Sequence, residues 1–190
     1  HIPMDLTLSW DLFVLVFFGI IIAYSYIIGK HESVKIIVFT YIAIVAGQGA
    51  GNIIAELSKQ SQPFLASFGL TVDITIFGST KLLIFVATIV FLSVRGGFDV
   101  TYNNEAGLLV NIILTGMYGF VTAGLLLTTL LTFVSGSPLL DANLAQSPAL
   151  RDIVVQSELM QLMVLHQDVW FSLPALLLIG VGIVSNKEPA

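Results

Sequence analysis

The chain has 190 residues, of which 56% are hydrophobic and only 10% charged, and its mean hydropathy is +0.97. A soluble domain carries about 25% charged residues, so this composition excludes an ordinary soluble domain and predicts a single integral membrane domain over residues 1–190. The net charge of -5 comes with only 7 Lys and Arg residues, which excludes the basic surface of a nucleic-acid-binding protein. There is no cysteine and therefore no thiol chemistry. Residues 1–3 precede the first methionine, so we expect them to be processing remnants and give them no weight.

The first spanning helix is predicted over about residues 10–29, close to the ~20 residues that cross a bilayer core. Trp10 suits the membrane interface, and Asp11 is expected to cap the helix start. No basic flank precedes this run, so we expect a retained helix and not a cleaved signal peptide. The connection after Gly29 is so short that the second helix, residues 33–57, should return antiparallel to the first as a hairpin.

The third and fourth helices follow a predicted loop over residues 58–71. The charge-free run before Arg95 is too short to span a bilayer, so the third helix is expected to cover residues 73–94 and to include Lys81. Lys81 is then the one basic side chain within the membrane zone. The fourth helix covers residues 106–134, which is long enough to cross with tilt.

Two different segments complete the chain. Residues 147–166 alternate apolar and polar positions at helical spacing, which is typical of an amphipathic helix at the membrane interface. Residues 169–185 predict a short fifth spanning helix despite Pro174 near its start. We therefore expect an all-α polytopic membrane bundle with four or five transmembrane helices and one interfacial helix.

The distribution of basic residues predicts the orientation. With the amino terminus outside, four basic residues fall on the cytoplasmic side and two outside, which agrees with the positive-inside rule. The cytoplasmic four are Lys30, Lys35, Arg95 and Lys187, and the outer two are Lys59 and Arg151.

Small residues recur every four positions on the second and fourth helices. On an α-helix this spacing makes one smooth strip, where the backbone of another helix can approach closely. We therefore expect these two helices to pack on each other at the centre of the bundle, with one strip left over for a second copy of the chain. The strips are Ala43, Gly47, Gly51 and Ala55 on the second helix, and Thr115, Gly119 and Ala123 on the fourth.

A second row on the second helix is polar and is the best candidate for function. Gln48, Asn52 and Glu56 share one face, and Lys81 of the third helix is expected at a similar depth. A carboxylate near a lysine in low dielectric can relay protons, coordinate a cation or gate a passage. In the alternative interpretation, Glu56 lies at the interface with Lys59 and the amides only bond between helices.

The layout resembles the CvpA (colicin V production) family over about residues 8–165. The resemblance depends on Trp10-Asp11 opening the first helix, Gly29-Lys30 closing it, the glycine-rich second helix, and Arg95 with the glycines after it. The fourth helix with Gly116, Gly119 and Gly124, followed by an amphipathic region, is also similar to that family. The resemblance implies a small inner-membrane protein of bacteria, associated with bacteriocin production or envelope maintenance, and it implies no catalytic residues.

We therefore expect a non-enzymatic inner-membrane scaffold or envelope factor that forms a homo-oligomer in the lipid bilayer, with a membrane or envelope protein as a candidate further partner. One alternative is a small channel or ion-coupled transporter that uses the polar row, and another is a structural subunit of a membrane array. No cofactor is expected. A metal site at His166 is not expected either, because no second ligand pair with metal spacing accompanies this histidine.

Overall fold

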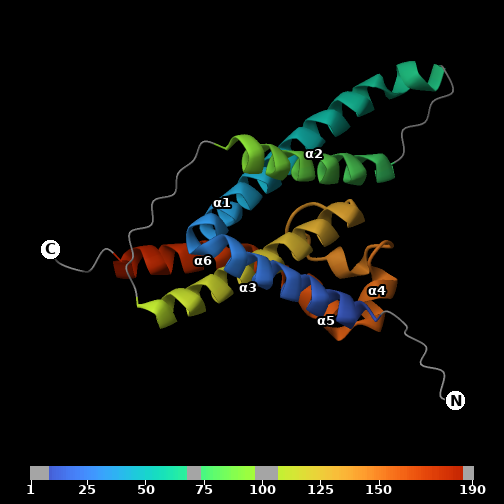
Figure 1. Ribbon diagram of the computed structural model, residues 1–190. Helices are drawn as coiled ribbons and strands as arrows, with labels where there is room; N and C mark the ends of the chain where they lie inside the picture. The colour runs from blue at the N-terminus through green and yellow to red at the C-terminus, as the bar shows by residue number, and fades with distance from the viewer. Residues whose placement is uncertain (1–8, 68–73, 97–106, 186–190) are drawn as a thin grey trace, which may run out of the picture.

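The structure is a computed structural model that describes residues 9–67, 74–96 and 107–185. No strand occurs in these three ranges, and the predicted all-α class is confirmed (Figure 1). The helices, in chain order, are α1 (Trp10–Ser67), α2 (Ile74–Arg95), α3 (Leu108–Ser135), the 3-10 turn η1 (Leu144–Gln146), α4 (Arg151–Gln156), α5 (Glu158–Leu165) and α6 (Gln167–Ser185).

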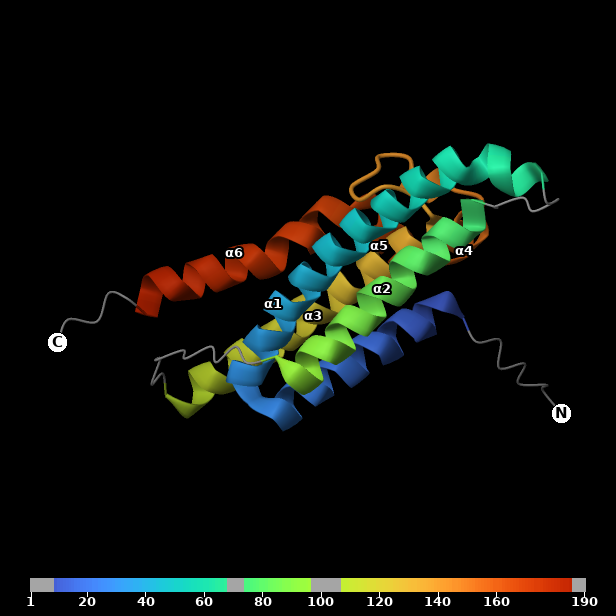
Figure 2. The ribbon, with the colours of Figure 1, turned by 90° about the horizontal axis from the view of Figure 1, so that it is seen from above.

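Helix α1 is a hairpin of two arms, residues 10–28 and residues 30–67, joined at Gly29. Gly29 has φ 82° and ψ 171°, a conformation that essentially only glycine adopts. Figures 1 and 2 show the two arms running in opposite directions along the bundle. The Ser33 hydroxyl lies 2.9 Å from the Gly29 carbonyl and 3.4 Å from the Ser25 carbonyl, which ties the arms together at the turn. The hairpin is the one that the sequence predicts, with its turn reduced to a single residue.

The second arm is longer than predicted. The sequence predicts that the helix ends at Leu57 and that residues 58–71 form a loop, but the helix continues to Ser67 and only residues 68–71 lie outside the described ranges. The Ser61 hydroxyl bonds the Leu57 carbonyl at 2.8 Å within the helix. Pro63 lies inside the helix and removes only one backbone donor, which an exposed helix end tolerates.

Helices α2 and α3 lie where spanning helices were predicted. Helix α2 begins at Ile74, since Asp73 lies outside the described residues, and α3 begins at Leu108 for the same reason. Lys81 belongs to α2, as predicted. Residues 97–106, between α2 and α3, and Lys187 also fall outside the described part of the chain.

The predicted single amphipathic helix over residues 147–166 is wrong. Ser157 has an extended backbone (φ −139°, ψ 119°) that separates α4 from α5, and its side chain accepts a hydrogen bond from the Met160 amide. Serine competes well for such capping positions, so a helix boundary forms inside the amphipathic pattern. Helices α5 and α6 then meet at an angle of 69°.

Within the described ranges, three helices are long and apolar enough to cross a membrane, namely α1, α2 and α3, and the bent pair α5 and α6 would make a fourth if it counts as one span. This count takes α1 as one helix, although Gly29 divides it. The protein is therefore a helical membrane bundle in composition and in fold.

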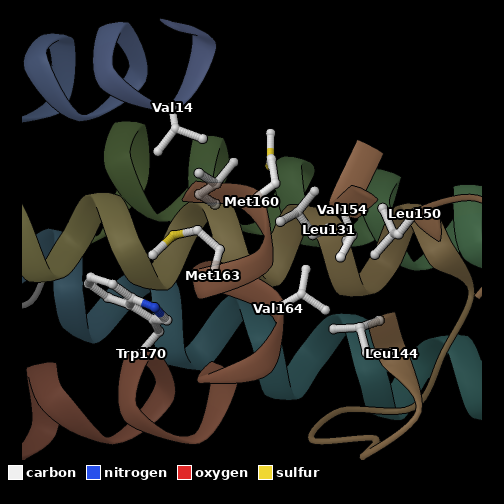
Figure 3. Close-up of a cluster of buried hydrophobic side chains, with 10 residues drawn as sticks. Val14, Leu131, Leu144, Leu150, Val154, Met160, Met163, Val164 and Trp170 are labelled. Carbon is white, nitrogen blue, oxygen red and sulfur yellow. The ribbon is translucent and has the colours of Figure 1, made fainter. Parts of the chain in front are cut away.

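Helix α3 is the centre of the bundle. In its most apolar stretch of 18 residues 67% of the residues are buried, compared with 17% in the corresponding stretch of α2. Each of the three buried hydrophobic clusters contains residues of α3. Figure 3 shows the largest of them, in which Leu131 of α3 meets Val14 of the first arm and side chains from η1 to α6. The short helices at the carboxyl side therefore belong to the core of the bundle and are not a separate unit.

Candidate functional site

The polar row of the second arm meets Lys81 of α2. The Lys81 side chain is only 8% exposed, and its Nζ donates to Oε1 of Gln48 at 3.4 Å. Gln48 Nε2 in turn donates to Oδ1 of Asn52 at 3.4 Å. The structure thus brings together three of the four predicted residues of the polar row.

Glu56 does not join them. It pairs with Lys59 one helical turn on, with 4.0 Å between Nζ and Oε2, and both side chains are about two-thirds exposed, at 64% and 68%. Within the described residues, the only other ion pair joins Lys35 and Glu32, so Lys81 has no carboxylate partner there. The predicted carboxylate–lysine pair is absent, and Glu56 lies in the exposed position that the alternative interpretation gives it.

Gly51 makes room for Lys81. A Cβ atom at this position would overlap with Lys81 Cγ and lie 3.0 Å from Cε and 3.1 Å from Cδ. The glycine therefore lets the lysine stem lie flat against the second arm and carry its ammonium group to Gln48.

The small-residue strip of the second arm faces α2. Ala43, Gly47 and Gly51 are buried and Ala55 is half-buried. A Cβ at Gly47 would lie 3.1 Å from the backbone carbonyl of Lys81 and 3.4 Å from the ring of Phe133. This strip is therefore covered by α2 and the end of α3.

The strip of α3 faces the first arm. Thr115, Gly119 and Ala123 are buried, and a Cβ at Gly119 would lie 2.9 Å from Cα of Ile22 and from Oγ of Ser25. The prediction that the second and fourth helices pack on each other is confirmed, since one cluster joins Ala43 and Ile44 of the second arm to Leu125 and Phe133 of α3. The two strips do not meet along their length, because Gly119 lies against the first arm and Gly51 against Lys81 of α2. Spacing along one helix identifies a strip but not its partner, because the partner depends on how the helix is rotated.

Asp11 caps a distant helix. Its Oδ1 accepts hydrogen bonds from the Ser157 hydroxyl at 2.6 Å and from the Leu159 amide at 3.0 Å. Both donors lie at the amino terminus of α5, where backbone amides lack helical partners and a negative charge is favoured. The sequence places Asp11 at the start of its own helix and gives no sign of this contact, because its partners lie far along the chain.

Tyr41 enters the hydrogen-bond ladder of α6, which sequence reasoning also missed. Its hydroxyl donates to the Phe171 carbonyl at 2.6 Å and accepts from the Ala175 amide at 3.1 Å. These are the two groups that would bond each other in a regular helix. Pro174 lies between them and lacks an N–H, so the ladder is already interrupted there. Pro174 marks the interruption in the sequence, but nothing in the sequence identifies Tyr41 as the group that fills it.

No group of three or more His, Asp or Glu side chains that could hold a metal ion occurs in the described ranges. Comparison of the chain with protein-family models, with curated proteins and with solved structures finds no match. The geometry itself offers one buried, amide-bonded lysine between two membrane helices, and a set of side-chain contacts that lock the helices together.

Proposed function

We propose that the chain is a non-enzymatic inner-membrane scaffold of the CvpA type that assembles as a homo-oligomer. In this proposal the two arms of α1, together with α2 and α3, are four membrane spans, and α6 is a fifth. The observation that supports it best is the free end of the second arm of α1.

This end extends beyond the part of the arm that the bundle covers. Residues 30–67 would be about 57 Å long at the helical rise, compared with a hydrocarbon core of about 30 Å. From Asn52 to Ser67, no residue whose exposure is described is buried. Figure 1 shows this end leaning away from α3, α4 and α5, with only α2 beside it. A helix of this length is long enough for the end of the second arm to extend beyond the membrane.

An apolar stripe follows the free end. Ile53, Leu57 and Phe64 are 63%, 58% and 68% exposed, and their spacing of four and seven residues places them on one helical face. We call these three residues the arm stripe. Polar residues lie between them, including the ion pair of Glu56 and Lys59, so the stripe is the apolar side of an amphipathic helix. Two copies of such a stripe can cover each other about a two-fold axis, since an isologous contact uses the same patch twice.

Support for a second copy comes from this stripe alone. The small-residue strips no longer argue for one, because each is covered by another helix of the same chain. The test is the oligomeric state in lipid nanodiscs, measured by light scattering. We expect more than one copy for the unaltered protein and a single copy for the Leu57→Ser/Phe64→Ser variant.

The control is Val45→Ser, which changes a residue that is 70% exposed on the same arm but outside the stripe. This variant should keep the oligomer. A monomeric unaltered protein, or an oligomer that survives the double substitution, would refute assembly through the arm stripe.

A small channel or ion-coupled transporter is the second candidate, and the buried Lys81 favours it. Ionisable side chains within spanning segments commonly mark ion pathways, and this one bonds to an amide row. If the protein is a transporter, Lys81→Met should change ion flux in liposomes. Glu56→Gln should leave the flux unchanged, because Glu56 pairs with Lys59 and takes no part in the hydrogen bonds among Lys81, Gln48 and Asn52. Equal flux in liposomes with and without the protein would remove this candidate.

A further inference from the structure

Two neighbouring apolar cavities lie along the first arm of α1. Two cavities of about 410 Å³ and 500 Å³ lie between this arm, α3 and α6, and they share Ile22 and Phe120 in their walls. The first is bounded by α5 at its outer end, and the second continues along α3 to Ile113. We call the two cavities together the lateral groove.

The wall of the groove is apolar and partly aromatic. Phe18, Phe120 and Trp170 contact one another with ring centroids 5.3 to 5.8 Å apart. Gly19 lies beside them, and a Cβ atom there would meet nothing within 4 Å. The missing side chain at Gly19 therefore leaves open space against an aromatic wall.

The groove has the length of one lipid chain. From Leu15 to Ile22 the first arm rises about 10 Å, and from Phe120 back to Ile113 α3 covers about the same again. The resulting length of about 20 Å exceeds the depth of one leaflet, about half of the ~30 Å hydrocarbon core. One acyl chain would therefore be accommodated along its whole length.

Two carboxylates lie beside the α5 end of the groove. Asp11 lies one helical turn before Leu15, on the same face, and bonds the amide of Leu159, which also lines the groove. Glu158 is exposed immediately before Leu159. Carboxylates at this position would attract a headgroup that ends in an ammonium group and would not attract an anionic one.

We propose that the lateral groove is a lipid-binding site that takes one acyl chain of phosphatidylethanolamine, with the headgroup ammonium beside Asp11 and Glu158. The site is independent of the arm stripe, which lies on the other arm of α1, so the failure of one proposal leaves the other intact.

The test uses Trp170 as a reporter. The protein has two tryptophans, so Trp10→Phe leaves Trp170 as the only one. In liposomes that contain phosphatidylethanolamine with brominated acyl chains, we expect strong quenching of Trp170 fluorescence, although its side chain is only 8% exposed. Gly19→Phe fills the groove and should remove most of that quenching.

The matched control is Gly49→Phe, because a Cβ at Gly49 also meets nothing within 4 Å but this residue does not line the groove. This variant should be quenched as strongly as the parent. Weak quenching in the parent, or equal quenching after Gly19→Phe, would overturn the groove as a lipid site.

The headgroup is tested by comparing brominated phosphatidylethanolamine with brominated phosphatidylcholine, whose quaternary ammonium group cannot donate hydrogen bonds. We expect stronger quenching by the former, and loss of that difference in Asp11→Asn. An amide at this position keeps an oxygen that can accept from Ser157 and Leu159 while it removes the charge. Equal quenching by both lipids in the parent would overturn the amine-headgroup assignment.

Discussion

At the scale of single residues, two side-chain contacts tie neighbouring helices of the bundle together. Gly51 accommodates the stem of Lys81 between the second arm and α2, and Tyr41 bonds both sides of the interruption at Pro174 in α6. The first contact depends on the absence of a Cβ atom at Gly51, and the second depends on the hydroxyl oxygen of Tyr41. A small substitution at either position should therefore disrupt the contact.

Gly51→Ala should destabilise the protein, because the new Cβ overlaps with Lys81 Cγ close to the backbone of α2. Overpacking of this kind costs about 1–3 kcal/mol. Thermal unfolding in detergent should show a lower Tm for this variant, whereas Gly49→Ala, which points into open space, should leave Tm unchanged. In a Lys81→Ala background the same substitution should cost much less, since the clashing atoms are gone. An equal loss in both backgrounds would show that the lysine stem is not the cause.

Tyr41→Phe should loosen α6 around Pro174. The substitution leaves the Phe171 carbonyl and the Ala175 amide without their shared partner. A fully buried unsatisfied group costs about 1–3 kcal/mol, and these half-buried groups should cost less. Hydrogen exchange should become faster at the Ala175 amide than in the unaltered protein. Tyr24→Phe, which removes a hydroxyl from an exposed tyrosine, is the control and should change nothing at Ala175. Unchanged exchange in Tyr41→Phe would mean that α6 closes its own ladder.

At the scale of the elements, hydrophobic length predicts where helices lie, and local chemistry decides where they end. The spanning segments and the reversal at Gly29 follow from the sequence because apolar runs and a short connection limit the possibilities. The break at Ser157 and the extension of the second arm to Ser67 do not follow, since capping and an exposed proline are weak local effects. The partners of the small-residue strips could not be predicted either, because helix rotation is set by the whole bundle.

The same limit applies to the candidate site. The sequence places Gln48, Asn52 and Glu56 on one face, but in the structure Lys81 bonds only Gln48, and the chain of hydrogen bonds continues from Gln48 to Asn52 and ends there. Only the residues level with Lys81 can bond it, and which residues are level with it depends on how α2 is placed against the second arm. The roles of Asp11 and Tyr41 involve partners more than 100 residues away, as the separations of 146 and 130 residues show, which no local pattern records.

Asp11→Ala should release the amino terminus of α5 from the first arm. The Ser157 hydroxyl and the Leu159 amide would lose their acceptor, so hydrogen exchange over residues 158–161 should become faster. Asp11→Asn should largely preserve protection, because its amide oxygen can still accept both bonds. Asp152→Ala, on the exposed side of α4, is the matched control and should leave α5 unchanged. Faster exchange in the control as well would point to general loosening and not to loss of the cap.

At the scale of the whole molecule, the helix ends gather at two ends of the bundle. The Gly29 turn, the end of α2 and the start of α3 lie together, while the chain start, α4 and α5 lie at the other end (Figures 1 and 2). Three basic residues lie near the first end, since Lys30 and Lys35 follow Gly29 and Arg95 ends α2. Two lie toward the other end, since Arg151 begins α4 and Lys59 lies near the end of the second arm. Apart from Lys81, which lies within α2, the described basic residues are therefore distributed three to two, which supports the proposal that the Gly29 end is cytoplasmic and the amino terminus outside.

Single cysteines test this orientation cleanly, because the chain has none of its own. His31 and Glu158 are both exposed, and Asp11, bonded to the start of α5, lies about 27 Å of helix from Gly29. That distance nearly equals the hydrocarbon thickness of about 30 Å, so the two positions should lie on opposite sides of the membrane. In intact cells a membrane-impermeant maleimide should label Glu158→Cys but not His31→Cys, and after lysis it should label both. The reverse pattern would invert the proposed topology, and labelling of both in intact cells would mean that the first arm does not cross.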